Sequence, residues 1–168
     1  MTAPLPSVFV AFGSNLGESA RILQQSSLRL QELSDHPLHK SSLWQTVPVD
    51  CPPGSPLFLN TVAGLVPRAD ETPESLLDKL QQLEREFGRQ PKKTPNEPRP
   101  LDLDLIAFGS ETRATERLTL PHPRAHRRGF VLGPLAEIAP DLVLPGQTKT
   151  VAQLLAQLAA SEAPRKLA

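Results

Sequence analysis

Cysteine is almost absent from this chain of 168 residues, which contains Cys51 alone. A single cysteine excludes an intrachain disulfide framework and favours a reducing compartment. Cys51 could act as a nucleophile or be an unreactive loop thiol, and the second role is the more common one for a lone cysteine. The sequence therefore gives no reason to expect a catalytic cysteine.

Net charge is also absent, since 18 basic side chains balance 18 acidic ones. A neutral chain has no overall field that would favour nucleic acid or an anionic membrane as a partner. No apolar run approaches ~18 residues, and the N-terminus lacks a basic start followed by an apolar segment. We therefore expect a monomeric cytoplasmic protein with small-molecule partners. Its length predicts one domain, residues 1–168, with frayed last residues.

Positive charge is nevertheless concentrated in two segments. Residues 88–99 contain four basic side chains against one acidic side chain, and residues 113–128 contain five against one. Proline gathers in the same parts of the chain, with loops expected at 47–56, 91–100 and 121–123. Loops stiffened by proline lose less entropy when they order around a ligand. Two short cationic loops favour a compact polyanion over a long one.

Hydrophobic periodicity and turn residues predict an alternation of strands and helices. Thr72-Pro73 is the clearest helix start, because threonine is a good N-cap and proline suits the first helical turn. Strands are expected at 7–12, 58–66, 101–108 and 118–120, an extended segment at 38–47, and helices at 18–33, 72–87 and 151–158. The order β-α-β-β-α-β predicts an α+β ferredoxin-like sandwich, in which helices pack on a mainly antiparallel sheet.

The most informative motif is Arg99-Pro100-Leu101-Asp102-Leu103-Asp104-Leu105. On a strand, Asp102 and Asp104 share one face and the leucines take the other. The Cα atoms of the two acids would lie roughly 6.5 Å apart, which is two strand steps of about 3.3 Å. Both carboxylates can then bind one Mg²⁺ or a pair of ions about 4 Å apart. With a cationic loop leading into the strand, the motif indicates metal-assisted chemistry on a phosphate.

Three blocks together resemble the 6-hydroxymethyl-7,8-dihydropterin pyrophosphokinase family of folate biosynthesis. They are Gly13-Ser14-Asn15-Leu16-Gly17, the Arg99–Asp104 block, and Leu120-Pro121-His122-Pro123 followed by Arg128-Gly129-Phe130. The resemblance continues to Pro134-Leu135-Ala136-Glu137-Ile138-Ala139-Pro140. It implies a transferase that moves a pyrophosphoryl group from ATP to the pterin hydroxymethyl group and releases AMP.

The resemblance also implies residue roles. Asp102 and Asp104 would hold two Mg²⁺ ions, and Arg89 and Arg99 would bind the triphosphate and stabilise charge during transfer. The nucleotide contacts that it implies are Gln81, Glu84, Arg89, Arg99, Leu105, Arg117, Thr119, His122 and Arg128. The pterin contacts that it implies are Thr46, Val47, Val49, Phe58, Asn60 and Phe130. A loop over residues 88–100 is expected to order over bound ATP and exclude water.

Several of these residues could instead have a purely structural role. The two acids could lie on a solvated edge strand, His122 could be a turn histidine, and Phe58 and Phe130 could be core residues. Two other functions also compete. A two-metal nucleotidyl transferase would need a further carboxylate and a nucleic-acid path. A non-catalytic pterin or nucleotide binder would not need the arginines and aspartates to be intact.

Overall fold

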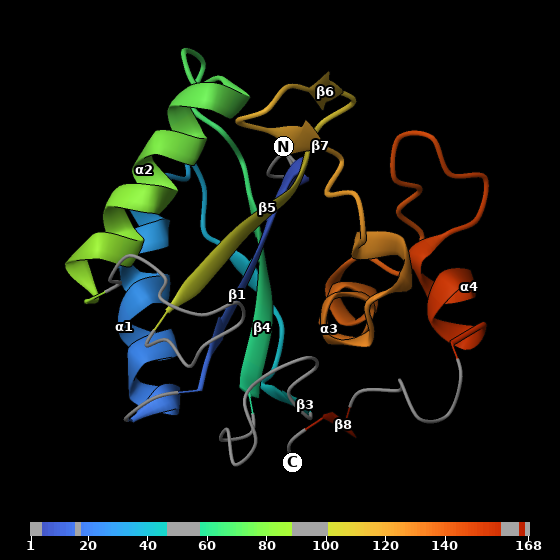
Figure 1. Ribbon diagram of the computed structural model, residues 1–168, viewed down its shortest axis with the longest axis horizontal. Helices are drawn as coiled ribbons and strands as arrows, with labels where there is room; N and C mark the ends of the chain where they lie inside the picture. The colour runs from blue at the N-terminus through green and yellow to red at the C-terminus, as the bar shows by residue number, and fades with distance from the viewer. Residues whose placement is uncertain (1–4, 16–17, 47–57, 89–100, 159–164, 167–168) are drawn as a thin grey trace.

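The computed structural model describes residues 5–15, 18–46, 58–88, 101–158 and 165–166 (Figure 1). Within these residues a six-stranded sheet has the order β5-β1-β4-β3-β8, and β2 pairs with β4 beside β3. Every pairing in it is antiparallel, as expected from the sequence. The strands are β1 (Val8–Ser14), β2 (His39–Lys40), β3 (Trp44–Thr46), β4 (Phe58–Leu65), β5 (Asp102–Phe108) and β8 (Arg165–Lys166).

Helices cover both faces of the sheet, and the sheet separates the core into two parts (Figure 1). On one face, α1 (Ser19–Gln31) and α2 (Pro73–Glu86) contribute leucines such as Leu23 and Leu80 to a cluster with the inward residues of β1 and β5. On the other face lie α3 (Gly129–Ile138) and α4 (Val151–Ala156), whose apolar side chains pack against Phe9, Val62 and Ile106. The sheet is therefore the middle layer, and one of its faces also carries the polar site described below.

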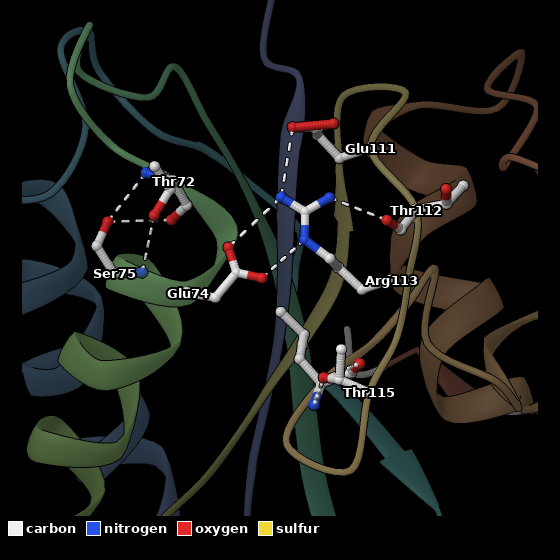
Figure 2. Close-up of polar contacts among 8 residues, drawn as sticks. Thr72, Glu74, Ser75, Glu111, Thr112, Arg113 and Thr115 are labelled. Atoms are coloured by element: carbon white, nitrogen blue, oxygen red, sulfur yellow. Dashed lines mark hydrogen bonds and ion pairs between the residues drawn. The ribbon is translucent and has the colours of Figure 1, made fainter.

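The start of α2 confirms the helix signal in the sequence. Thr72 is the N-cap, and its hydroxyl accepts a hydrogen bond from the Ser75 backbone N–H at 3.1 Å. The Ser75 hydroxyl in turn accepts from the Thr72 backbone N–H at 2.9 Å, which completes a capping box (Figure 2). Gly88 follows the helix with a φ of 95°, a left-handed conformation that glycine adopts without strain.

Helix α3 was not predicted from the sequence. Gly129, Gly133 and Pro134 lie inside it, and these residue types disfavour a helix interior. The helix forms because its residues 131–135 are all buried, so tertiary packing outweighs local propensity. The expected strands and helices otherwise appear near their predicted bounds, although the extended segment at 38–47 is divided between β2 and β3.

The C-terminal region differs from expectation at two residues. Fraying was expected there, whereas Arg165–Lys166 forms β8 and pairs with Trp44 and Gln45 of β3. A further strand pair, β6 (Arg113–Ala114) and β7 (Thr119–Leu120), lies apart from the main sheet, and a short 3₁₀ helix, η1 (Ala125–Arg127), precedes α3. In the part of the chain that the structure describes, no helix has the length and apolar character needed to span a bilayer.

Replacing Leu80 with alanine should lower the free energy of unfolding by about 2–5 kcal/mol, because it leaves a cavity in the core beneath α2. Leu80 is 1% exposed, whereas Leu28 on α1 is 68% exposed, so Leu28→Ala is the matched control with an effect within about 0.5 kcal/mol. Urea unfolding of both variants measures the difference. Equal effects would contradict this account of the core.

Candidate active site

Strand β5 presents its two acids on the face of the sheet that α3 covers. Asp102 pairs with Gly13 of β1 and Asp104 with Ala11, whose side chain lies in the α3-side core. The alternating Leu103 and Leu105 are buried in the opposite core, against α1 and α2. Both acids are partly exposed. The prediction that Asp102 and Asp104 share one face is therefore confirmed, whereas their role as metal ligands is not tested by this geometry.

A row of four residues crosses the sheet at the end of β5. Asp102 pairs with Gly13, Gly13 with Asn60 of β4, and Asn60 with Trp44 of β3. Directly paired residues of antiparallel strands project on the same side, so this cross-strand row lies on one face. A Cβ atom on Gly13 would lie 2.7 Å from Asn60 Oδ1. The Asn60 side chain therefore occupies the space above Gly13, and a larger residue here would force that side chain to shift.

His122 is attached to the edge of β5. Its backbone N–H donates to the Ile106 carbonyl at 2.9 Å, and its Nδ1 accepts from the Arg124 backbone N–H at 3.2 Å. Burial lowers the pKa of His122 to about 4, with a further lowering from the charges of Arg128 and Arg124 and an opposing effect from Asp102. The imidazole is thus neutral at pH 7. Because Nδ1 is an acceptor, the proton lies on Nε2, which can donate to a ligand.

Arg128 brings a positive charge to the two acids. Burial lowers its pKa, while attraction to Asp104 and Asp102 raises it, and a guanidinium stays charged under both influences. Its guanidinium carbon lies 5.2 Å from the centroid of the Phe130 ring, in the range of a cation–π interaction. Arg128 is also the N-cap of α3, so this helix positions a predicted nucleotide contact and a predicted pterin contact together.

Glu84 of α2 lies beside the same strand. Its Oε2 accepts a hydrogen bond from the backbone N–H of Leu103 at 2.8 Å, between the two acids of β5. This hydrogen bond supports the strand that carries Asp102 and Asp104, and periodicity could not predict it. The nucleotide contact expected of Glu84 stays a prediction.

The β6–β7 hairpin is held against α2 by two ion pairs. Arg113 Nε donates to Glu74 Oε2 at 2.7 Å, and the guanidinium also contacts Glu111 at 3.5 Å (Figure 2). This hydrogen bond from Arg113 lowers the pKa of Glu74. Arg117 pairs with Asp78, one turn further along the same helix face. Arg117, a predicted nucleotide contact, therefore has a carboxylate partner before any nucleotide binds.

Other predicted site residues fall into four groups. Gln81 on α2 and Thr119 on β7 are exposed, which leaves both accessible to a ligand. The Leu105 side chain is buried in the core on the face opposite Asp102, so any nucleotide contact from it must come from its backbone. Phe58 is partly buried and pairs with Thr46 across β3 and β4. Outside the described residues lie Val47, Val49, Arg89 and Arg99, together with the 89–100 part of the expected loop.

Carboxylate oxygens such as those of Asp102 and Asp104 suit magnesium better than a tightly held transition metal. Among the residues that the structure describes, no cluster of three or more histidine, cysteine, aspartate or glutamate side chains could hold a metal ion. Mg²⁺ commonly takes one or two protein carboxylates and completes its shell with phosphate oxygens and water. Asp102 and Asp104 could supply such a pair once a phosphate ligand is present.

The sequence did not predict the contact between Glu137 and the segment Ser42–Trp44, which reaches the cross-strand row at Trp44. Glu137 of α3 accepts hydrogen bonds from Ser42 and from the Trp44 indole, across a separation of more than 90 residues. Neither a periodic pattern nor a local motif links such distant positions. Glu137 belongs to a block that carried the family resemblance, and that was the signal available in the sequence.

A family model described as 7,8-dihydro-6-hydroxymethylpterin-pyrophosphokinase (HPPK) matches residues 9–140. The chain is 38% identical over 154 residues to the 2-amino-4-hydroxy-6-hydroxymethyldihydropteridine pyrophosphokinase of Haemophilus influenzae, covering 91% of this chain and 93% of that protein. It is 40% identical over 139 residues to the Pseudomonas aeruginosa protein of the same name, covering 82% and 83%.

Solved structures share the fold. The crystal structure of Plasmodium falciparum HPPK-DHPS wild type with pteroate aligns with a TM-score of 0.68 at 13% sequence identity. The alignment covers 92% of this chain but 43% of that one, so the present chain corresponds to less than half of that longer chain. At this identity the likeness concerns the fold alone, and it confirms the expected ferredoxin-like α+β architecture.

Replacing Gly13 with alanine should destabilise the fold by about 1–3 kcal/mol, because the new methyl group overlaps the Asn60 amide. Asn60→Ala removes the overlapping oxygen, so Gly13→Ala should cost much less in that background. Thermal or urea unfolding of the two single variants and the double variant measures the coupling. Additive effects would show that the Asn60 amide does not occupy the space above Gly13.

His122 should titrate near pH 4 in the folded protein, well below the ordinary histidine pKa of 6.5. Between these values the unfolded state binds more protons, so stability from His122 is full above about pH 6.5 and is lost as the pH falls towards 4. NMR titration of the His122 ring gives the midpoint. Unfolding of wild type and His122→Asn across this window gives the stability difference. A ring midpoint close to 6.5 would refute the burial argument.

Proposed function

This chain belongs to the 7,8-dihydro-6-hydroxymethylpterin-pyrophosphokinase family, and from that premise we propose that it transfers the pyrophosphoryl group of ATP to 6-hydroxymethyl-7,8-dihydropterin. It is a pyrophosphokinase of folate biosynthesis. The hydroxymethyl oxygen attacks the β-phosphorus and forms the new O–P bond, while the bond from that phosphorus to the α–β bridging oxygen breaks. The products are AMP, the pterin diphosphate and the hydroxyl proton.

The observation that most supports this proposal is the shared face of Asp102 and Asp104, next to His122 and Arg128. Phosphoryl transfer depends mainly on positioning and on neutralising charge, and needs little covalent chemistry from the protein. A surface that combines two carboxylates, a neutral imidazole donor and a guanidinium can orient a metal-bound triphosphate. A solvated edge strand would not bring these cationic and donor groups to the same acids.

Asp102 and Asp104 would hold Mg²⁺, two ions by family resemblance. When bound, Mg²⁺ supplies neutralisation of phosphate charge and a fixed orientation of the reacting oxygens. His122 donates a hydrogen bond from its Nε2–H to a phosphate oxygen and keeps its proton, so it remains neutral. Arg128 binds phosphate oxygens through its planar guanidinium. We assign Arg89 and Arg99, which lie outside the described residues, to the triphosphate by resemblance.

For the pterin, we assign Phe58 and Phe130 to the faces of the ring and Asn60 to its hydrogen-bonding edge. An aromatic side chain packs well on a flat heteroaromatic ring, and an amide offers both a donor and an acceptor. Asn60 lies in the cross-strand row next to Gly13, with Asp102 at one end. A pterin bound over Asn60 therefore has the predicted metal ligands within reach of its hydroxymethyl group.

We further propose that the chain acts as a monomeric single domain in the cytoplasm, with ATP and the pterin as its partners and no nucleic acid or membrane. The balanced charge of the chain supports this assignment. Size-exclusion chromatography with light scattering at micromolar concentration tests the monomer.

One assay tests the proposed reaction. AMP formation from ATP should require both the pterin and Mg²⁺, and the pterin diphosphate should appear in equal amount. AMP release without pterin would indicate ATP hydrolysis, and release of pyrophosphate in place of AMP would indicate a nucleotidyl transferase. Either result would overturn the proposed function.

Asp102→Asn and Asp104→Asn should each lower turnover by about 10²-fold or more, because each removes a charged oxygen ligand at nearly constant size. Circular dichroism and melting temperature should stay close to wild type, since both side chains are partly exposed. Asp141→Asn, at an exposed aspartate beyond α3, is the control and should keep full turnover. Near-normal turnover of either site variant would remove that residue from the metal site.

A further inference from the structure

Glu137 links helix α3 to strand β3. Its two carboxylate oxygens each accept a hydrogen bond from the Ser42 backbone N–H, both at 3.1 Å. Oε2 also accepts from the Ser42 hydroxyl at 2.7 Å, and Oε1 from the Trp44 indole N–H at 2.9 Å. Hydrogen bonds to a charged acceptor are stronger than neutral ones, so this contact holds three groups of one short segment in fixed positions.

The segment that Glu137 holds ends at the predicted pterin site. Trp44 is the first residue of β3 and pairs directly with Asn60. In the cross-strand row, Trp44 lies at the opposite end from Asp102. Three inter-strand spacings of about 4.8 Å separate these ends, which is roughly 14 Å. Asn60 lies between Trp44 and Gly13, so Trp44 lies on the side of Asn60 away from the predicted metal ligands, and Lys166 of β8 is its next cross-strand neighbour.

We propose that Glu137 is a positioning residue for pterin recognition, and that it acts by fixing the Trp44 indole as the outer wall of the pterin site beside Asn60. This inference rests on the proposed function and deepens it. An indole offers its ring face to a heteroaromatic substrate only if its orientation is fixed, and the Nε1 hydrogen bond to Glu137 supplies that constraint. Preorganisation of this kind lowers the entropy lost on binding.

The position of Glu137 fits this role. Glu137 is exposed, and it reaches Ser42 and Trp44 from α3. α3 packs against both β3 and β4, and Phe130 lies in its first turn, two residues after its N-cap Arg128. The helix thus carries the Phe130 ring at its start and the Trp44 anchor near its end. One rigid element sets the distance between two aromatic groups of the same predicted site.

The test separates recognition from folding by comparing the KM values for the two substrates. Glu137→Ala should raise the KM for the pterin about tenfold or more, because it removes the carboxylate that accepts hydrogen bonds from Ser42 and the Trp44 indole. The KM for ATP should stay within about twofold of wild type, and so should kcat at saturating pterin. Glu137→Gln keeps one acceptor oxygen and should show a smaller rise in pterin KM.

The control is Glu32→Ala. Glu32 is also an exposed glutamate with a hydrogen-bonded partner, Arg29, but it lies at the end of α1 on the opposite face of the sheet. This variant should keep both KM values. A melting temperature within a few degrees of wild type for all variants shows that folding is not the cause.

A double-variant cycle assigns the effect to the indole. Trp44→Phe keeps an aromatic ring but loses the N–H donor, so its effect on pterin KM should largely disappear in the Glu137→Ala background. Trp44 is the sole tryptophan of the chain, so tryptophan fluorescence measures the environment of this indole alone. Its emission should change on Glu137→Ala without ligand, and pterin should quench it in wild type.

The outcomes distinguish the two proposals. Wild type that forms AMP with pterin, together with a Glu137→Ala variant of unchanged pterin KM, overturns the positioning role alone. A parallel rise in both KM values with a lowered melting temperature also overturns it, since that result describes a structural contact. A wild type without pterin-dependent AMP formation overturns the proposed function and this inference with it.

Discussion

The alternation of β5 is the constraint on which the site depends. Leu103 and Leu105 bury their side chains against α1 and α2, and this burial forces the intervening acids to the other face. A shift of one residue in register would bury two carboxylates and expose the leucines, at a cost comparable with the stability of an ordinary domain. The same apolar packing that stabilises the fold therefore fixes which way the predicted metal ligands point.

Electrostatic balance at the site comes from groups on separate segments. Asp102 and Asp104 lie on β5, His122 follows β7, and Arg128 begins α3. Two like charges on one strand face repel, and the Arg128 guanidinium offsets part of that repulsion before any ligand arrives. The neutral His122 adds a donor without adding charge. The result is a surface that can accept both a cation and a polyanion.

The sequence predicted well those features that depend on local pattern. The period of two in β5, the Thr72 cap of α2 and the order of the main strands all follow from neighbours a few residues apart. Helix α3 could not be found in this way, because its glycines and proline oppose a helix and only burial explains it. The contacts of Glu84 with Leu103 and of Glu137 with Trp44 could not be predicted from the sequence for a related reason. These contacts join residues far apart in the sequence, and hydrophobic periodicity gives no information about such pairs.

The contact between Glu84 and the Leu103 amide has a consequence beyond catalysis. In the described part of the chain β5 pairs with β1 on one side only, so it is an edge strand of the main sheet. Unpaired N–H groups on an edge can recruit a foreign strand and begin aggregation. A carboxylate at the Leu103 N–H occupies one of these donors and places a negative charge where an incoming strand would have to dock. The hydrogen bond that supports the acidic strand thus also opposes pairing of this edge with other protein chains.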